Sequence, residues 1–556
     1  MTISKNGAAA LVQSMINQGV KYVFGIPGAK VDQLFDLLEN TDNPAAPQLI
    51  VTRHEQNAAL IAAGIGRLTG VPGVVAVTSG PGVSNLATGL ITATSEADPV
   101  IAIGGQVPRG DLSRLTHQSI ASTALLKAAT KSSVEVETAD NLSEVFANAY
   151  NEAVSPKPGA TFISIPKDVL SEPVTVPEIK ALKPVHQGQI DTESLATLVS
   201  QLKMAKRPAI LVGMRGSTPA VAEALQKLLR RYHVPVVETF QGSGVISHDL
   251  EDQFFGRVGL FHNQIGDQLL QNSDLVLTVG YDPVEYEARF WNPDRTGQTV
   301  AIDSVTPEIS TDYQPDLTVV ADIAASLNAV AAALPEGLVL ADEQQRELQD
   351  LRTTFVAQNT VPDSKPGQGV HPLAIVAALQ RQVTDETTVT VDVGSHYIWM
   401  DRHFRSYNPR HLLFSNGMQT LGVALPWAIA AALVRPGKPV ISISGDGGFL
   451  FSGQELETAV RLNLNIVQLI WNDGFYDMVK FQEKAHYGRD AGVTLGAVDY
   501  VKYAESFGAQ GLRAETPAEL QAALTQALAT DGPSLIDIPV DYRDNIRFVT
   551  DSLADL

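Results

Sequence analysis

The chain has 556 residues, which at about 150 residues per domain predicts three or four domains. Sixty-one acidic against 40 basic residues give a net charge of −21, which disfavours nucleic acid and anionic membranes as partners. The absence of cysteine excludes disulfides, thiolate nucleophiles and cysteine-ligated metal sites. Residues 1–28 lack a signal-peptide pattern, and the longest apolar run, 424–434, is about half a membrane span. We therefore expect a soluble, cytoplasmic protein in which local groups, not net charge, would hold any bound anion.

Short β-branched runs alternate with helical patterns along the whole chain, which is typical of parallel sheets covered by helices. We predict an α/β fold with three doubly wound parallel-sheet domains. The expected strands are residues 22–26, 48–52, 74–78, 100–103 and 161–165, then 209–212, 234–238, 275–279, 300–302 and 317–320, then 388–391, 440–444, 466–471 and 534–538.

Two segments interrupt this alternation and predict linkers. Residues 171–190 contain three prolines and little periodicity, and residues 335–370 hold a charged helical piece (341–351) followed by a Pro-, Asp- and Gly-rich stretch. The predicted domains are therefore residues 1–175, 190–335 and 370–556.

Neither common phosphate-binding loop is present. No G-x-G-x-x-G fingerprint and no G-x-x-x-x-G-K-[ST] motif occurs, which disfavours dinucleotide dehydrogenases and P-loop nucleotidases.

The best phosphate and metal candidate is the turn Gly445-Asp446-Gly447-Gly448, which follows a predicted strand and precedes a helix over 454–460. Glycines allow close backbone approach to a ligand, but Asp446 would repel a phosphate unless a cation such as Mg²⁺ lay between them. A second carboxylate follows the next strand, in Asn472-Asp473-Gly474. Both turns should lie at the carboxyl edge of one sheet, where α/β proteins bind ligands. The alternative is a helix cap and an ordinary turn.

The first domain offers a carboxylate at the start of a helix over about 55–68. Helical spacing places Glu55 on the same face as Ala58, Ala59 and Ala62, the packed side, where an unpaired carboxylate is costly. Glu55 is therefore a candidate acid or base, although a first-turn Glu can also simply favour the helix dipole. The Gly- and Pro-containing loops at 25–28 and 78–85 are suited to close backbone approach, and each could also be only a turn.

Together these segments resemble the thiamine-diphosphate enzymes of the pyruvate decarboxylase and acetohydroxyacid synthase group. The matching segments stand in the family's order, at residues 25–28, 53–55, 78–82, 162–166, 445–447 and 472–473. The resemblance implies an N-terminal pyrimidine-binding domain, a central domain and a C-terminal diphosphate- and metal-binding domain. It further implies thiamine diphosphate and Mg²⁺ as cofactors, and a site formed between subunits of a homodimer at least, with a homotetramer as the expected form.

The resemblance also implies roles for single residues. Glu55 matches the glutamate that hydrogen-bonds N1′ of the aminopyrimidine, and Asp446 matches the first metal ligand. Counting back from Met478 makes Asp473 and the Phe475 carbonyl the other ligands, whereas anchoring on the Asn selects Asn472; we favour Asp473 because a carboxylate suits Mg²⁺ better than an amide. The implied cofactor-binding residues are Pro27, Gly28, Thr78, Gly82, Asn85, Gly394, Ser395, His396, Met418, Gln419, Leu421, Gly445, Asp446, Gly447, Gly448, Asp473, Phe475, Tyr476 and Met478.

Within this group, the chain resembles the catabolic, FAD-independent acetolactate synthases. Synthases that serve branched-chain amino-acid synthesis carry Arg-Phe-Asp-Asp-Arg and bind FAD; residues 280–286 here lack those arginines, so no FAD is expected. Those enzymes also have a Trp where this chain has Gln482. The resemblance implies that pyruvate is decarboxylated and joined to a second pyruvate, giving 2-acetolactate and CO₂ in acetoin and butanediol formation. Gln118, Lys30 and Gln482 would position the acceptor or the intermediate. Pyruvate oxidase chemistry, simple pyruvate decarboxylase chemistry and a non-enzymatic regulator on the same scaffold remain the alternatives; the presence of both Glu55 and Asp446 disfavours the regulator.

Overall fold

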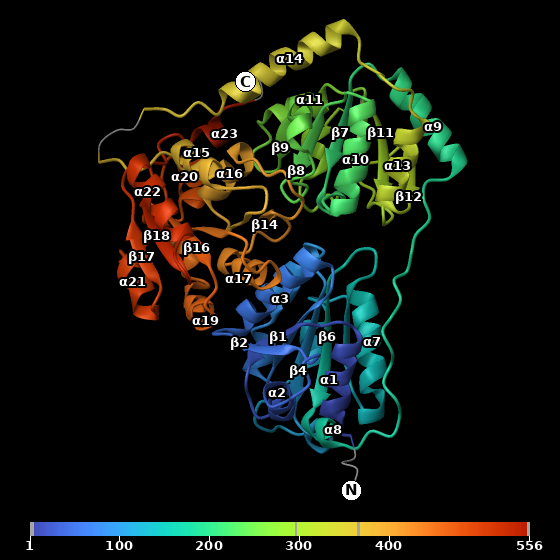
Figure 1. Cartoon of the computed structure of the whole chain (residues 1–556), viewed down its shortest axis with the longest axis vertical. Coiled ribbons are helices and arrows are strands. Elements are labelled where there is room, and N and C mark those ends of the chain that lie inside the picture. The colour runs from blue at the N-terminus through green and yellow to red at the C-terminus, as the bar shows by residue number, and fades with distance from the viewer. Residues whose placement is uncertain (1–4, 295–296, 364–366, 553–556) are drawn as a thin grey trace. The chain divides into compact units, whose positions relative to one another are not determined.

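A computed structural model describes residues 5–294, 297–363 and 367–552, and its strands form three six-stranded parallel sheets covered by helices (Figure 1). The predicted fold class is thereby confirmed. The domain boundaries near residues 175, 190, 335 and 370 remain a prediction.

The first sheet has the order β2-β1-β3-β4-β6-β5, with every neighbouring pair parallel. Its strands are β1 (Tyr22–Ile26), β2 (Gln48–Val51), β3 (Gly73–Val77), β4 (Val100–Gln106), β5 (Ser132–Glu135) and β6 (Ala160–Pro166). The helices of this region are α1 (Gly7–Asn17), α2 (Asp32–Glu39), α3 (Glu55–Thr69), α4 (Pro81–Ser84), α5 (Ala87–Ser95), α6 (Ser122–Leu126), α7 (Leu142–Ala153) and α8 (Lys167–Ser171).

The second sheet has the order β12-β11-β10-β7-β8-β9. Its strands are β7 (Pro208–Val212), β8 (Val236–Thr239), β9 (Phe254–Val258), β10 (Leu275–Val279), β11 (Gln298–Asp303) and β12 (Leu317–Val320). The helices are α9 (Thr192–Met204), α10 (Pro219–Arg231), α11 (Ile265–Gln271), α12 (Ala288–Trp291), α13 (Ile323–Ala333) and α14 (Asp342–Ala357).

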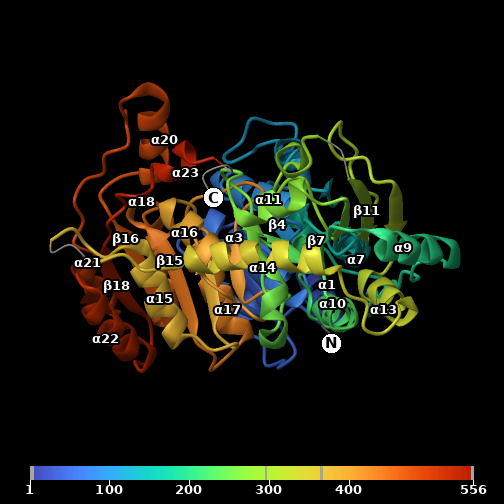
Figure 2. The same ribbon diagram turned by 90° about the horizontal axis from the view of Figure 1, so that it is seen from above.

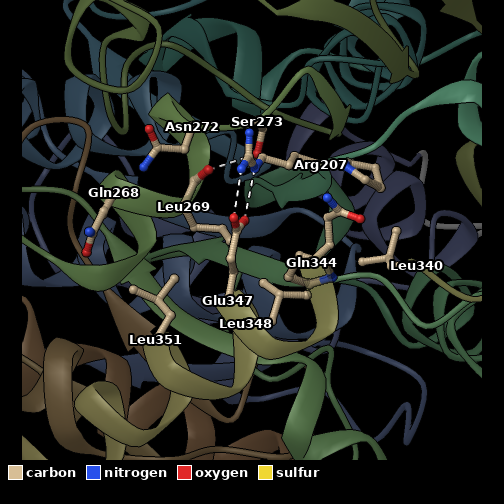
Figure 3. A pocket seen from close by; sticks show the side chains of 12 residues that line it. Arg207, Gln268, Leu269, Asn272, Ser273, Leu340, Gln344, Glu347, Leu348 and Leu351 are labelled. Atoms are coloured by element: carbon tan, nitrogen blue, oxygen red, sulfur yellow. Dashed lines mark hydrogen bonds and ion pairs between the residues drawn. The ribbon is translucent and has the colours of Figure 1, made fainter. Parts of the chain in front are cut away.

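The charged helix α14 lines a cavity of about 380 Å³ together with Pro208 at the start of β7 and Ser273 just before β10. Across the mouth of this cavity Arg207 makes a two-pronged ion pair with Glu347 of α14, at 2.8 and 3.0 Å (Figure 3). Both side chains are about half exposed, so the pair contributes little stability by itself.

The third sheet has the order β14-β13-β15-β16-β18-β17. Its strands are β13 (Thr388–Val391), β14 (Leu412–Phe414), β15 (Val440–Gly445), β16 (Ile466–Asn472), β17 (Gln510–Arg513) and β18 (Ser534–Pro539). The helices are α15 (Pro372–Gln382), α16 (Ser395–His403), α17 (Ala424–Val434), α18 (Asp446–Phe449), α19 (Leu456–Arg461), α20 (Asp477–Tyr487), α21 (Tyr500–Phe507), α22 (Pro517–Leu528) and α23 (Arg547–Thr550). Helices α20 and α23 lie side by side (Figure 2).

The chain folds into two compact units, each made of segments that are not contiguous in the sequence. The first unit holds the chain up to Val185 together with residues 422–437 and 452–464, and the second holds the remainder. Helix α17 therefore packs on α3, and a Cβ placed on Gly64 of α3 would lie 2.7 Å from the Cβ of Ala430. Near it, the guanidinium of Arg67 lies 4.2 Å from the Trp427 ring. The apolar run predicted at 424–434 is thus a core helix. Among the residues that the structure describes, no helix has the length and apolar content needed to cross a membrane.

Candidate active site

A cavity of about 230 Å³ lies at the carboxyl edge of the third sheet, in the second unit. The cavity is lined by the segments that follow β13, β14, β15, β16 and β18. This carboxyl edge is where parallel α/β sheets bind ligands. The predicted residues that it brings together are Gly394, Ser395, His396, Gln419, Leu421, Gly445, Asp446, Gly447, Gly448, Asp473, Phe475, Tyr476 and Met478.

Two predicted residues of this region lie outside the cavity lining. Met418 is 44% exposed, and the Nε2 of Gln482 donates to the Met478 carbonyl at 2.6 Å, one turn back along its own helix. Five residues of the lining were not predicted from the sequence, namely Val393, Trp471, Asp477, Val479 and Tyr542.

Asp446 begins α18 directly after β15, and two backbone N–H groups hold its carboxylate. Gly447 donates to Oδ1 at 3.0 Å, and Gly474, from the turn after β16, donates to Oδ2 at 2.7 Å. Burial raises the pKa of Asp446 to about 6 despite these donors. The turns after β15 and β16 are therefore tied together through this one carboxylate.

Asp473 lines the same cavity, and its charge is poorly compensated. Burial, together with the negative charges of Asp477 and Asp446, raises the pKa of Asp473 to about 8. Asn472, the other possible ligand, donates instead to Asp537 Oδ1 at 3.0 Å and does not line the cavity. This geometry favours Asp473 over Asn472 as the group that would meet a cation.

Asp446 and Asp473 do not make a complete metal site by themselves. In the described part of the chain, no three His, Asp or Glu side chains converge as a metal-binding group. A cation between the two carboxylates would need further oxygen ligands, which Mg²⁺ typically takes from backbone carbonyls, water and phosphate.

Glycines bring the backbone close to the cavity. A Cβ on Gly447 would lie 2.6 Å from the Tyr476 ring, and a Cβ on Gly394, at φ +154°, would lie 2.6 Å from the His396 ring. His396 is buried, its Nε2 has no hydrogen-bond partner among the described residues, and burial lowers its pKa to about 3. A neutral imidazole with an unpartnered Nε2, a glycine-lined wall and two carboxylates that need a cation fit a diphosphate held through Mg²⁺.

The N-terminus of α16 and the N-terminus of α20 are linked through Asp477. Its Oδ2 accepts a hydrogen bond from Ser395 Oγ at 2.7 Å and another from Asn545 Nδ2 at 2.5 Å. Asn545 in turn accepts one from Trp399 Nε1 at 2.8 Å. The loop at Gly394–His396 is therefore anchored to the segment that carries Asp473 and Met478.

The predicted residues of the first unit gather at the carboxyl edge of the first sheet. Glu55 is the first residue of α3, half-buried, and its Oε2 accepts a hydrogen bond from Asn85 Nδ2 at 3.0 Å. A Cβ on Gly82 would lie 3.7 Å from Glu55 Oε1. Ala58, Ala59 and Ala62 are fully buried, as the helical pattern predicted. Glu55 itself is thus not enclosed in the core but stands at its margin with a hydrogen-bond partner.

The loops around Glu55 are closely packed. A Cβ on Gly28 would lie 2.6 Å from the Cβ of Thr78, whose Oγ1 is buried without a partner among the described residues. The neighbouring Pro27 is exposed, and the Cβ of Lys30 lies 2.6 Å from a Cβ placed on Gly105, near the end of β4. A Cβ on Gly80, at φ +67°, would lie 3.0 Å from the Cβ of Gln118.

Two predicted site residues have a positive φ, a backbone conformation that residues other than glycine rarely adopt. Gln118 has φ +61° and Gln419 has φ +51°. Such conformations cost free energy and persist where the surrounding structure imposes them, often at functional sites.

Glu55 belongs to the first compact unit and Asp446 to the second.

Three family models match the chain in the order of its three sheets. They are the N-terminal TPP binding domain, the central domain and the C-terminal TPP binding domain of thiamine pyrophosphate enzymes, at residues 5–125, 195–330 and 392–538. The chain belongs to the thiamine pyrophosphate enzyme family.

Relatives that align with nearly the whole chain include several acetolactate synthases. The chain is 48% identical over 551 residues to "Acetolactate synthase" of Bacillus subtilis (strain 168), which covers 99% of this chain and 96% of the relative. It is 44% identical to "Acetolactate synthase, catabolic" of Raoultella terrigena, over 97% of this chain and 96% of the relative. It is 31% identical to "Probable acetolactate synthase large subunit" of Methanocaldococcus jannaschii, over 98% and 93% of the two chains.

Proposed function

We propose that the protein converts two molecules of pyruvate to 2-acetolactate and CO₂, using thiamine diphosphate and Mg²⁺, in acetoin and butanediol formation. The observation that carries this proposal is the full-length similarity to acetolactate synthases, at 48% and 44% identity, one of them catabolic. The paired carboxylates and the glycine-lined cavity supply the residues that such an enzyme requires.

Several residues would hold the cofactor at the second unit. Asp446, Asp473 and the carbonyl of Phe475 would ligate Mg²⁺, and backbone N–H groups beside the cavity glycines would face the diphosphate. Because burial keeps His396 neutral, its unpartnered nitrogen can donate or accept a hydrogen bond without adding charge. Met418, Gln419 and Leu421 would pack against the cofactor from the loop after β14.

When bound, thiamine diphosphate would supply a carbon nucleophile for the pyruvate carbonyl and, in its positively charged thiazolium ring, an acceptor for the electron pair left by CO₂. Glu55 would hold a proton at the pyrimidine nitrogen N1′. Its Oε2 is already fixed by Asn85, so Oε1 is the oxygen that remains to face the cofactor. Pro27, Gly28, Thr78 and Gly82 would provide the wall around this carboxylate.

Gln118 and Lys30 are proposed to position the acceptor pyruvate. Both follow strands of the first sheet at its carboxyl edge, and the strained backbone of Gln118 supports a functional role. Gln482 is also proposed to position the acceptor: one N–H of its amide donates to the Met478 carbonyl, which leaves its second N–H and its amide oxygen for a ligand.

We further propose that the enzyme works without FAD. At the carboxyl edge of the second sheet, the nearly buried Arg215 pairs with Asp282 at 2.6 Å and with Asp303 at 2.7 Å. Beside them Glu285 is buried and accepts hydrogen bonds from Met214 N and Thr239 Oγ1, both at 2.8 Å. These side chains thus occupy part of the edge where an α/β sheet would take a nucleotide. A colourless purified protein with full activity is expected.

A homodimer at least, and a homotetramer as the expected form, remain proposals, as does a cytoplasmic location. Leu450, Phe451 and Val479 are 44–46% exposed near the cavity segments, and a subunit interface would remove this apolar surface from water. Sedimentation velocity of the holoenzyme would show a species of twice or four times the chain mass of 59.4 kDa.

The test of the proposed function is product analysis. The protein is supplied with ¹³C-labelled pyruvate, thiamine diphosphate and Mg²⁺, and the products are followed by NMR. Acetolactate as the main product supports the proposal. Acetaldehyde would instead indicate a decarboxylase, and a flavin-dependent, oxygen-consuming reaction would indicate an oxidase.

A further inference from the structure

The start of α3 is held by a buried carboxylate that stands some 400 residues further along the chain. Glu455 ends the 3₁₀ turn Gly453–Glu455, in the part of the C-terminal third that belongs to the first unit, and it is fully buried. Its Oε1 accepts hydrogen bonds from the backbone N–H groups of Arg53 at 2.9 Å and His54 at 3.1 Å, and from Asn57 Nδ2 at 3.1 Å. Its Oε2 accepts one from Thr458 Oγ1 at 2.7 Å.

These donors surround Glu55 in the sequence. Arg53 and His54 precede it, Asn57 follows it in the first turn of α3, and His54 is the N-cap residue, whose Nδ1 accepts from Gln56 N. Burying a carboxylate costs several kcal/mol unless hydrogen bonds compensate, and Glu455 receives four. Its charge also lies where a helix N-terminus favours a negative group.

We propose that Glu455 is a positioning residue for Glu55: it fixes the backbone from which the Glu55 side chain projects, while Asn85 fixes the carboxylate. The inference rests on the acid–base role proposed for Glu55. A side chain held at both its backbone and its carboxylate has little freedom to leave the pyrimidine nitrogen, and a displacement of about 1 Å can cost a catalytic group about 10²-fold in rate.

A neighbouring ion pair provides a matched control. Glu457, two residues after Glu455, forms an ion pair with Arg53, with its Oε2 3.3 Å from Arg53 Nε. The Glu457 and Arg53 side chains are 32% and 39% exposed. A pair between partly exposed side chains contributes little, and this one holds no backbone N–H group of residues 53–55. Glu457→Gln should therefore leave the geometry of Glu55 unchanged.

The experiment measures deuterium exchange at C2 of bound thiamine diphosphate in the Mg²⁺ holoenzyme, without pyruvate. Glu455→Asp keeps the charge but withdraws the carboxylate by one methylene, and Glu455→Ala removes it. We expect exchange to fall by about 10- to 100-fold in both, with cofactor Kd changed by less than about threefold. Glu455→Gln, whose amide oxygen can accept the same donors, should stay within about threefold of wild type, as should Glu457→Gln. If Glu455→Ala does not fold, Glu455→Asp carries the test alone, and exchange within twofold of wild type in Glu455→Asp overturns the inference.

A double-mutant cycle separates positioning from general structural damage. In a Glu55→Gln background there is no carboxylate to position, so Glu455→Asp should cause no further fall in the residual exchange rate. A further fall of the same size would overturn the inference. Because exchange needs no pyruvate, a protein that shows the predicted exchange pattern but forms no acetolactate would refute only the proposed reaction. One that forms acetolactate with exchange indifferent to Glu455 would refute only this inference.

Discussion

Replacing Asp473 by Asn should stabilise the ligand-free protein and remove most of the stabilisation that Mg²⁺ and thiamine diphosphate provide. The reason is that the same carboxylate is unfavourable without a cation and necessary with one. Burial first, and then the charges of Asp477 and Asp446, raise the pKa of Asp473 from 3.8 to about 8.

The magnitude follows from this pKa. A carboxyl group whose pKa is raised by folding contributes stability that is complete below pH 3.8 and is lost as the pH rises to about 8. Each pH unit in that window costs about 1.4 kcal/mol, so the ligand-free protein loses up to about 4 kcal/mol at pH 7. Asp473→Asn cannot ionise and recovers this loss. If the substitution weakens ligand binding about 100-fold, the holoenzyme loses about 2.7 kcal/mol of ligand-induced stabilisation.

The assay is thermal denaturation at pH 5, 6, 7 and 8, first in EDTA and then with saturating Mg²⁺ and thiamine diphosphate. The advantage of Asp473→Asn over wild type in EDTA should grow with pH, while its ligand-induced rise in Tm should shrink. Asn472→Ala is the control: it loses one hydrogen bond to Asp537, costs about 1 kcal/mol in both conditions and keeps the ligand-induced rise. The reasoning is refuted if Asn472→Ala abolishes the rise and Asp473→Asn preserves it.

Three further substitutions test the site. Glu55→Gln should lower turnover of pyruvate by about 10²-fold or more, while cofactor affinity measured by calorimetry stays within about threefold of wild type. Near-normal turnover would refute the acid–base role of Glu55. Asp446→Ala should abolish Mg²⁺-dependent retention of thiamine diphosphate on gel filtration, and unchanged retention would count against the metal site. Gly447→Ala would place a Cβ 2.6 Å from the Tyr476 ring. Cofactor affinity should therefore fall by about 10-fold, which lies within the 1–3 kcal/mol typical of an overpacked contact. Unaltered affinity would show that the turn accommodates the extra methyl group without cost.

The sequence predicted the inner strands of each sheet well and missed strands at the edges. The unpredicted strands β5, β9, β14 and β17 are each the outermost strand of their sheet. Edge strands need no continuous apolar run, because one side of the ladder is unpaired and short or polar strands are favoured there. In β9 the charged residue Arg257 obscured the strand, because an arginine is expected to be exposed. It is instead buried, with its Nε 3.1 Å from Glu238 Oε2.

The site was predictable where it follows buried strands. Asp446 and Asp473 stand directly after β15 and β16, and parallel pairing of these strands brings their turns together whatever the surrounding sequence. Tyr542 and Asn545 were missed because no motif marks the segment after β18. Asp477 was missed because it reads as an ordinary acidic residue at the start of a helix.

The tie between Glu455 and α3 could not be predicted either. A glutamate at the start of a short helix normally faces solvent, and three of the four donors to this buried one come from the first third of the chain. For the same reason the sequence did not reveal that α17 and α19 pack with the first unit. Local patterns predict elements, whereas contacts between distant segments depend on how the elements pack.

The activity proposed for this chain joins two pyruvates with thiamine diphosphate and Mg²⁺ and without flavin. The most direct measurement strips the protein of metal and cofactors, restores thiamine diphosphate and Mg²⁺ only, adds pyruvate, and determines acetolactate by acid conversion to acetoin. Half a mole of acetolactate for each mole of pyruvate consumed, unchanged by added FAD, is the predicted result. Pyruvate consumption that yields acetaldehyde, or that begins only when FAD is added, would contradict the claim.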